Sequence, residues 1–277
     1  MEKKLTGSTV VVTGGTGVLG SCFCRALADN GAKVAILGRS LDKAENLATG
    51  INNAGGHAIG ISVDVCDKAG LENAKEVILN AFGAIDILIN GAGGNHPEGV
   101  TADEYFDSEK RNSGVKDFFE LGLEGMDHVF RLNYMGTFLP VQVFAAEMIG
   151  RRGCSIINIS SVSAFLPLTK VPAYSGAKAA ISNLTQWLSV YFAKEGIRVN
   201  AIMPGFFLTD QNRSLLTEPD GSLTARGHKI IGQTPMGRFG DPEDLISTLL
   251  WLCDPASAFV TGTVIPVDGG FTAFNGV

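Results

Sequence analysis

Short apolar runs alternate along the chain with segments that carry apolar residues at helical spacing. The runs show no polar alternation, which is typical of strands covered by helices on both faces. They predict strands at residues 9–12, 34–37, 58–63, 85–90, 155–160, 198–203 and 264–267. The segments between them predict helices at about 21–30, 41–53, 68–82, 126–149 and 174–194, and a last helix opening at Asp241-Pro242-Glu243. This order predicts an α/β fold with a doubly wound parallel sheet.

Two polar stretches interrupt the alternation. Residues 95–122 follow the fourth predicted strand and are rich in Asp, Glu, Lys and Asn, and residues 206–240 follow the sixth. Neither an internal repeat nor a low-complexity linker marks a domain boundary. We therefore expect residues 1–277 to form a single domain.

Composition narrows the class of protein. With 45% hydrophobic and 18% charged residues, the 277-residue chain can bury a large core. Its net charge of −6 speaks against a nucleic-acid binder. No apolar run reaches the length of a membrane span, and the opening MEKKL has no apolar stretch of a signal peptide, so we expect a cytoplasmic protein without a membrane partner. The five Cys and four His residues show no metal-ligand spacing, and no metal site is expected.

A glycine-rich turn follows the first predicted strand. It runs Thr13-Gly14-Gly15-Thr16-Gly17-Val18-Leu19-Gly20 and leads into a helix. In such a turn the backbone N–H groups and the positive end of the helix dipole can meet a pyrophosphate, and glycine allows the close approach. The placement after the first strand favours nucleotide binding.

Further candidates stand where other predicted strands end, the edge at which an open α/β sheet forms its ligand crevice. Asp64 follows the third strand and can accept a hydrogen bond from an adenine amino group. Asn90-Gly91-Ala92 follows the fourth strand, and Pro204-Gly205 the sixth. The second strand ends in Gly38-Arg39-Ser40, with no carboxylate for ribose hydroxyls and one guanidinium suited to a phosphate. We lean to NADP(H), with NAD(H) as the alternative in which Arg39 only stacks on adenine.

Tyr174 and Lys178 carry the candidate chemistry. Residues four apart on a helix share a face, so the phenol and the ammonium are expected to project into one site. The ammonium, helped by the positive charge of an oxidised nicotinamide, is expected to lower the pKa of Tyr174 from about 10. Tyr174 would then exchange a proton with a substrate oxygen as hydride moves. Seen alone, such a pair can also be a surface contact.

Two more polar residues support the interpretation of Tyr174 and Lys178 as part of a catalytic site. Ser161 closes the fifth predicted strand, and its hydroxyl can lie beside the phenol. Asn133 lies within the long helix predicted before that strand. Its amide can kink the helix and hold a water that leads to Lys178, or it can simply bond to the backbone.

Taken together, these motifs resemble the short-chain dehydrogenase/reductase family over nearly the whole chain, ending in Gly262-Thr263 and Val267-Asp268-Gly269-Gly270. The resemblance implies a Rossmann fold of about seven parallel strands, a homo-oligomer (tetramer or dimer), and a catalytic tetrad of Asn133, Ser161, Tyr174 and Lys178. It further implies that Lys178 binds the nicotinamide ribose and Thr209 the carboxamide. The implied cofactor-binding set is Gly14, Thr16, Gly17, Val18, Leu19, Arg39, Asp64, Val65, Asn90, Gly91, Ala92, Tyr174, Lys178, Pro204, Gly205, Phe207 and Thr209.

Two departures from the family pattern stand out. The middle glycine of the turn is displaced by one position, to Gly17. The stretch from Asn90 to Asn133 is also longer than in ordinary relatives, because it contains residues 95–122. We expect this insertion to lie near the active-site mouth as a lid, or else to be a surface decoration or a subunit contact. Residues 206–240 are expected to form a substrate-binding loop region.

Several stretches resemble a sugar-acid subgroup of the family, the D-mannonate oxidoreductases or fructuronate reductases. They are 93–98, 165–174, 205–213 and 233–240. A hexuronate needs cations for its carboxylate and polar groups for its hydroxyls. The candidate substrate-binding residues are Asn95, His96, Lys170, Asn212 and Arg213.

Alternatives to this reading come from the same family and from another class. A gluconate 5-dehydrogenase or a 3-oxoacyl carrier-protein reductase would use the same tetrad, although a net charge of −6 shows no basic patch for an acidic carrier. A non-catalytic nucleotide sensor would have no need of Ser161, Tyr174 and Lys178.

Overall fold

A seven-stranded parallel sheet forms the centre of the molecule, which we describe from a computed structural model over residues 4–111, 113–209 and 212–276. The strand order is β3-β2-β1-β4-β5-β6-β7, and every neighbouring pair is parallel. The strands are β1 (Thr9–Thr13), β2 (Lys33–Gly38), β3 (His57–Ser62), β4 (Ile87–Asn90), β5 (Ser155–Ile159), β6 (Arg198–Pro204) and β7 (Val264–Val267). The order turns back between β1 and β4, so a crevice is expected at the carboxyl ends of these two strands. The predicted doubly wound fold is confirmed.

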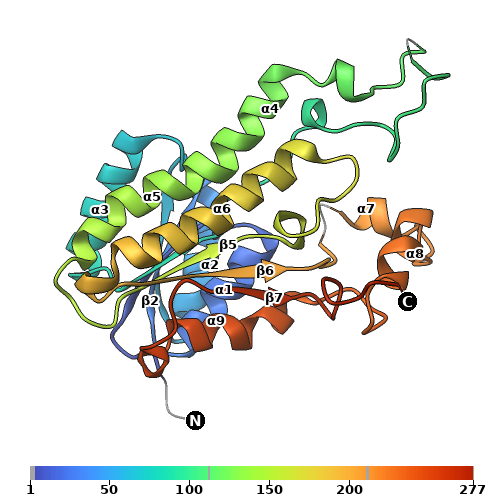
Figure 1. Cartoon of the computed structure of the whole chain (residues 1–277). Coiled ribbons are helices and arrows are strands. Elements are labelled where there is room, and N and C mark those ends of the chain that lie inside the picture. The colour runs from blue at the N-terminus through green and yellow to red at the C-terminus, as the bar shows by residue number, and fades with distance from the viewer. Residues whose placement is uncertain (1–3, 112, 210–211, 277) are drawn as a thin grey trace.

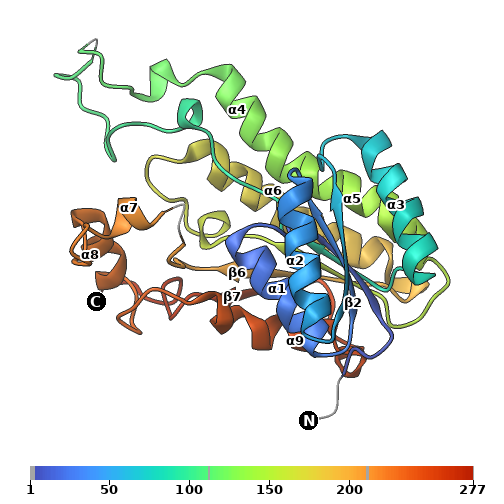
Figure 2. The same cartoon turned by 180° about the vertical axis from the view of Figure 1, so that it is seen from behind.

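Helices cover both faces of the sheet, as Figures 1 and 2 show. The helices are α1 (Val18–Asp29), α2 (Leu41–Asn53), α3 (Lys68–Phe82), α4 (Leu123–Phe130), α5 (Gly136–Phe144), α6 (Pro172–Tyr191), α7 (Arg213–Leu216), α8 (Ala225–Gly232) and α9 (Ile246–Cys253). Short 3₁₀ turns occupy Pro97–Gly99, Phe118–Glu120, Ala145–Met148, Val162–Ala164, Ala193–Glu195, Pro242–Leu245 and Pro255–Ser257.

The alternation of side chains along each strand explains the two layers. In β1, Val10 and Val12 face α1, α2 and α9, whereas Val11 faces α3, α5 and α6. All three valines are fully buried. Because both faces of the central strands are covered, nearly every strand position can be apolar, which is the pattern in the sequence.

The predicted helix at 126–149 is not continuous. Residues Arg131–Met135 form a π-helical turn between α4 and α5, and a 3₁₀ turn ends the run at Met148. Such a turn places one extra residue in the helix and is frequent at functional sites. Likewise, the helix expected to open at Asp241 begins with a 3₁₀ turn, capped by Asp241 and Asp244, before α9. In both cases the apolar pattern runs through the break, which is why the pattern did not reveal it.

Candidate active site

The glycine turn connects β1 to α1 at the carboxyl edge of the sheet. Gly14 has φ +64°, and a Cβ there would lie 2.8 Å from the backbone of Ala92. A Cβ on Gly20 would lie 2.2 Å from the Gly14 carbonyl oxygen. Both positions therefore require glycine. Gly17, the displaced glycine, is the N-cap of α1, and a Cβ there would be 3.3 Å from its nearest neighbour, so this position is less constrained.

A groove of about 540 Å³ runs along this edge of the sheet, past the ends of β1, β2, β3, β4, β5 and β6. Of the residues expected to bind cofactor, the groove is lined by Gly14, Thr16, Gly17, Val18, Leu19, Arg39, Asp64, Val65, Gly91, Ala92, Tyr174, Lys178, Pro204, Gly205, Phe207 and Thr209. Segments far apart in the sequence thus form one continuous cleft with a glycine-rich wall. A dinucleotide fits this arrangement of close backbone approaches, one acidic side chain and basic residues at the end of β2.

Asn90 is the exception among these residues. Its side chain is buried within the sheet and does not line the groove. The Asn90 amide donates to Asn158 Oδ1 at 2.8 Å, and the Asn158 amide donates to Thr185 Oγ1 at 2.9 Å. Asn90 therefore joins β4 to β5 and, through Asn158, to α6, so any contribution to cofactor binding would come from its backbone.

A second basic residue lies beside Arg39. Lys43 lines the groove in the first turn of α2, whose N-cap is Ser40. The Ser40 hydroxyl accepts from the Lys43 backbone N–H at 3.4 Å. The sequence motifs do not identify Lys43 as a cofactor-binding candidate, although an N-cap at Ser40 places it within one turn of Arg39. On the neighbouring strand end, Asp64 accepts a hydrogen bond from the Cys66 N–H at 2.8 Å.

Ser161, Tyr174 and Lys178 meet in the groove, where β5 ends and α6 begins. The Lys178 side chain is buried, and its Nζ donates to the Ile159 carbonyl at 2.8 Å. Nζ lies 5.6 Å from the centre of the Tyr174 ring. Ser161 Oγ accepts from the Ser163 N–H at 3.2 Å, which fixes the hydroxyl at the strand end. The shared helical face predicted for Tyr174 and Lys178 is present.

Burial sets the acidity of this pair. It raises the pKa of the Tyr174 phenol, and a hydrogen bond with Ser161 acts in the opposite direction. Burial also lowers the pKa of Lys178 to about 8. The expectation that Lys178 lowers the pKa of Tyr174 is therefore wrong for the chain by itself, because desolvation of the phenolate outweighs the other effects. A bound oxidised nicotinamide would supply the positive charge that favours the phenolate.

Asn133 lies in the π-helical turn and is fully buried behind the groove. Its amide nitrogen donates to the carbonyls of Gly94, at 2.7 Å, and Val129, at 2.8 Å. Its oxygen accepts from the Gly94 N–H at 3.3 Å. The predicted kink is present, and the side chain is tied to the backbone as the alternative expectation stated.

The Asn133 oxygen can accept a second hydrogen bond. Gly93 keeps open the space between this oxygen and Lys178, because a Cβ on Gly93 would lie 2.7 Å from Asn133 Oδ1 and 3.2 Å from Lys178 Nζ. Asn133 therefore holds the Gly94 turn in place. Its side-chain oxygen faces the same small space as the Lys178 ammonium.

The residues expected to bind substrate are spread around the mouth of the groove. Asn212 lines it, but its amide is bonded to the backbone of Phe207 and Thr209, at 2.8 Å each. His96 accepts from the Glu98 N–H at 3.2 Å, and its ring lies 5.0 Å from that of His128. Asn95 is exposed and caps the His96 N–H at 2.9 Å.

Neither Lys170 nor Arg213 lines the groove. Lys170 faces a separate recess in the insertion, and Arg213 begins α7. Lys170 has φ +72°, the one positive value for a non-glycine residue in the described part of the chain. Asp210 and Gln211, which belong to the 205–213 stretch, lie outside the described residues.

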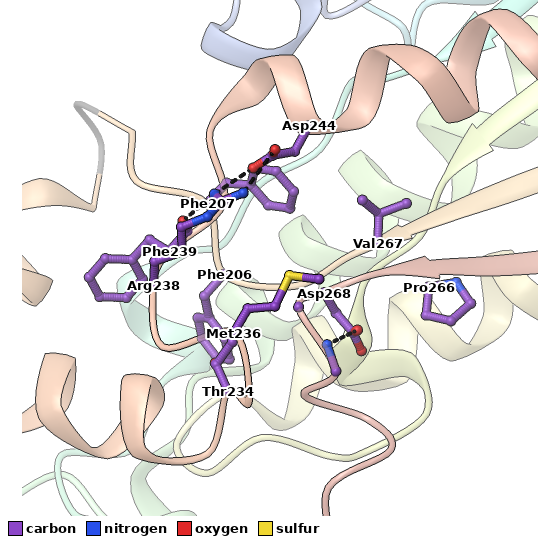
Figure 3. Close-up of a pocket in the computed structure, with 13 residues that line it drawn as sticks. Phe206, Phe207, Thr234, Met236, Arg238, Phe239, Asp244, Pro266, Val267 and Asp268 are labelled. Carbon is purple, nitrogen blue, oxygen red and sulfur yellow. Dashed lines mark hydrogen bonds and ion pairs between the residues drawn. The ribbon is translucent and has the colours of Figure 1, made fainter.

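A second cavity, of about 390 Å³, lies on the other side of Phe206 and Phe207 (Figure 3). Arg238 spans part of its wall and forms two hydrogen bonds with Asp244, at 2.6 and 3.0 Å. Asp268 accepts from the Gly270 and Thr272 backbone N–H groups. These charged groups are paired with each other or with backbone, so the cavity shows no acid–base constellation like that of the groove.

The described ranges contain neither a metal-binding cluster nor a membrane-spanning helix. No group of three or more His, Cys, Asp or Glu side chains there is arranged to hold a metal ion. No helix in those ranges has the length and apolarity to cross a membrane.

The fold and this groove define a nicotinamide-dependent oxidoreductase of the Rossmann type. The family model of the short chain dehydrogenases matches residues 8–220. The chain belongs to this family, which confirms the resemblance seen in the sequence, and it acts on a CH–OH group with an NAD(P) cofactor.

Individual relatives match over the full length. The uncharacterized oxidoreductase UxuB of Bacillus subtilis is 53% identical over 278 residues, covering 100% of this chain and 99% of that protein. A solved structure from Haemophilus influenza, described as a candidate D-mannonate oxidoreductase with bound NAD, superposes with TM-score 0.95 at 48% identity and covers 99% of this chain and 98% of that one. A gluconate 5-dehydrogenase from Burkholderia cenocepacia, in complex with NADP and tartrate, gives TM-score 0.82 at 30% identity, with 98% of each chain covered.

Proposed function

We propose that this chain interconverts D-mannonate and D-fructuronate, by hydride transfer between a nicotinamide cofactor and the carbon that carries the reacting oxygen. The observation that supports this choice most is its similarity, through 99% of its length, to the candidate D-mannonate oxidoreductase. A match of that extent includes the insertion at 95–122, which adjoins the groove through Gly94 and Leu132.

In this proposal Tyr174 is the acid–base residue. It gives a proton to the substrate oxygen in the reduction and takes it back in the oxidation. Ser161 donates a hydrogen bond to the same oxygen, and Lys178 holds positive charge near the phenol at neutral pH, because its pKa of about 8 leaves most of the ammonium protonated. Asn133 positions the Gly94 turn beside Lys178.

The test is a spectrophotometric screen of nicotinamide absorbance with hexuronates, aldonates and simple polyols. D-fructuronate reduction should exceed that of other six-carbon keto acids by at least about tenfold in kcat/KM. Equal turnover of neutral polyols and sugar acids would contradict the proposal. A preference for gluconate would favour the second candidate, a gluconate 5-dehydrogenase, which the tartrate-bound relative supports.

We further propose that the groove prefers NADP(H), with NAD(H) as the alternative. Arg39 and Lys43 stand together at the end of β2, and neither β2 nor the following turn offers a carboxylate that would repel a 2′-phosphate. Of the two solved relatives, the one from Haemophilus influenza holds NAD and the one from Burkholderia cenocepacia holds NADP. Arg39→Ala should weaken NADPH binding about tenfold and leave NADH binding nearly unchanged, as measured by fluorescence titration. Equal losses for both cofactors would assign Arg39 to adenine stacking.

A homo-oligomer, a dimer or tetramer in the cytoplasm, completes the proposal. The exposed apolar side chains of Trp187, Val190 and Tyr191 on α6 support it, because a contiguous apolar surface marks an interaction site. Sedimentation equilibrium measures the mass directly, and a monomer at micromolar concentration would contradict it.

A further inference from the structure

The insertion begins at the groove, and α4 leads from its end back to the groove. Gly94, at its start, is held by Asn133, and Leu132, just beyond α4 at its end, lines the cleft. Between these points the chain extends past α4 toward the end of the molecule that also carries α7 and α8 (Figures 1 and 2). The α7–α8 segment in turn follows Thr209 and Asn212, which line the groove. Two segments that each connect to the groove therefore come together at this end of the molecule.

An ion pair joins these two segments. Lys229 on α8 donates to Glu104 Oε2 of the insertion at 2.8 Å. Glu104 is the more buried partner, with 26% of its side chain exposed against 66% for Lys229. Its pKa is lowered first by the hydrogen bond with Lys229, and further by the charges of Lys170 and Arg226. One carboxylate of the insertion thus faces cations from two other segments around the mouth.

The backbone provides a second attachment. The Thr101 N–H donates to the Lys170 carbonyl at 3.0 Å, and Lys170 lies on the loop that leads into α6 and Tyr174. At φ +72° the Lys170 backbone is strained for a residue with a Cβ, so the surrounding contacts hold it in place. The insertion is therefore held at its start by the packing of Pro97–Gly99 on α4 and α6, at Thr101 by main chain, and at Glu104 by the ion pair with α8.

We propose that the Glu104–Lys229 ion pair is a latch that holds the insertion against α8 and limits the size of substrate that can enter the groove. The inference rests on the proposed function, since it assumes that the groove is selective for a compact substrate such as a six-carbon sugar acid. The pair is exposed, so it forms and breaks readily and is weakened by salt. The Thr101–Lys170 attachment remains when the pair is broken, so the insertion pivots instead of detaching.

The test compares catalytic selectivity in variants of this pair. We measure the ratio of kcat/KM for a bulky cyclic ketone to that for the sugar acid in Glu104→Gln, Lys229→Met and the double variant. Each should raise the ratio about two- to fivefold, and the double variant should match the single variants, because all three remove the same contact. Lys229→Arg, which keeps the charge, should retain the wild-type ratio.

Lys110→Met is the matched control. It removes an ion pair of similar geometry, with Asp103 at 2.9 Å, that lies wholly within the insertion. Its ratio should stay at the wild-type value. If Lys229 instead binds the substrate carboxylate, Lys229→Met lowers sugar-acid turnover while Glu104→Gln does not change the ratio, and that result overturns the latch.

Hydrogen exchange gives a readout that does not depend on turnover. Backbone amides of residues 225–232 and of the Glu104 segment should exchange faster in Glu104→Gln than in the wild type or in Lys110→Met. Unchanged exchange at both segments would also overturn the proposal. If the wild type turns over no sugar acid, the proposed function fails, whereas the exchange result and the selectivity between small and bulky neutral ketones still decide whether the latch exists.

Discussion

The two walls of the groove are built by different physical means. On the sheet side, Lys178 and Asn133 are buried and bonded to backbone carbonyls, and Ser161 is fixed by a backbone N–H. On the insertion side, Tyr105, Phe118 and Leu123 are exposed, and ion pairs of solvent-accessible residues supply many of the contacts. Rigid attachment serves the reaction, which needs fixed geometry, and weak attachment serves the entry of substrate. Substitutions on the sheet side should therefore lower activity or the free energy of unfolding strongly. Substitutions on the insertion side should change them only slightly.

The largest effect is expected at Tyr174. Tyr174→Phe removes the proton donor but keeps the ring, so kcat should fall by about a hundred- to ten-thousandfold while cofactor affinity stays within about twofold. Single-turnover kinetics and fluorescence titration measure the two quantities separately. A variant that retained a tenth of the activity would show that another group transfers the proton.

The buried Lys178 should make the stability of the fold depend on pH. Its pKa is lowered to about 8, so between that pH and about 10.4 the unfolded state binds more protons than the folded state. The stability of the wild type relative to Lys178→Met should therefore rise by about 2 kcal/mol across this window, because the burial of a charged amine is progressively relieved. Urea unfolding of both proteins at pH 7.5 and pH 10 measures the difference. A difference that does not change with pH would mean that Lys178 is not desolvated.

Asn133→Ala tests the π-helical turn. The change removes the hydrogen bonds to Gly94 and Val129 and leaves buried backbone groups without partners, so we expect a loss of about 2–3 kcal/mol in the free energy of unfolding. Thr137→Val is the control, because Thr137 makes a single bond to the Asn133 carbonyl at 2.8 Å and should cost about 1 kcal/mol. Equal losses in the two variants would contradict a special role for Asn133.

The smallest effect is expected on the insertion. Phe118→Ser replaces a side chain that is 66% exposed, so the free energy of unfolding should change by less than about 0.5 kcal/mol. Thermal unfolding of the wild type and the variant measures it. A loss of 2 kcal/mol or more would show that the insertion packs into an apolar interface, and the contrast between the two walls would then disappear.

The sheet side could be predicted well from the sequence. The strand at 264–267 and the helices at 41–53 and 68–82 have the predicted bounds, because their periodicity and their Ser40 and Asp67 caps are local signals. Ser161, Tyr174 and Lys178 could be brought together because parallel strands end at one edge of the sheet and helical spacing is regular.

Other features depend on information that the sequence does not carry locally. The sign of the pKa shift at Tyr174 follows from its burial, which only the packed structure defines. The partner of Glu104 lies 125 positions away in a segment of similar polar composition, so no spacing rule selects Lys229. The place of Asn90 at a strand end does not reveal that its side chain turns into the sheet.

The extra residue at Arg131–Met135 has a consequence for how this architecture can diversify. One residue inserted into a regular helix turns everything beyond it by about 100°, so the faces of α4 and α5 are offset from each other by that angle. The arm carried by α4 can therefore change its length or direction while α5 stays packed against α3 and β4.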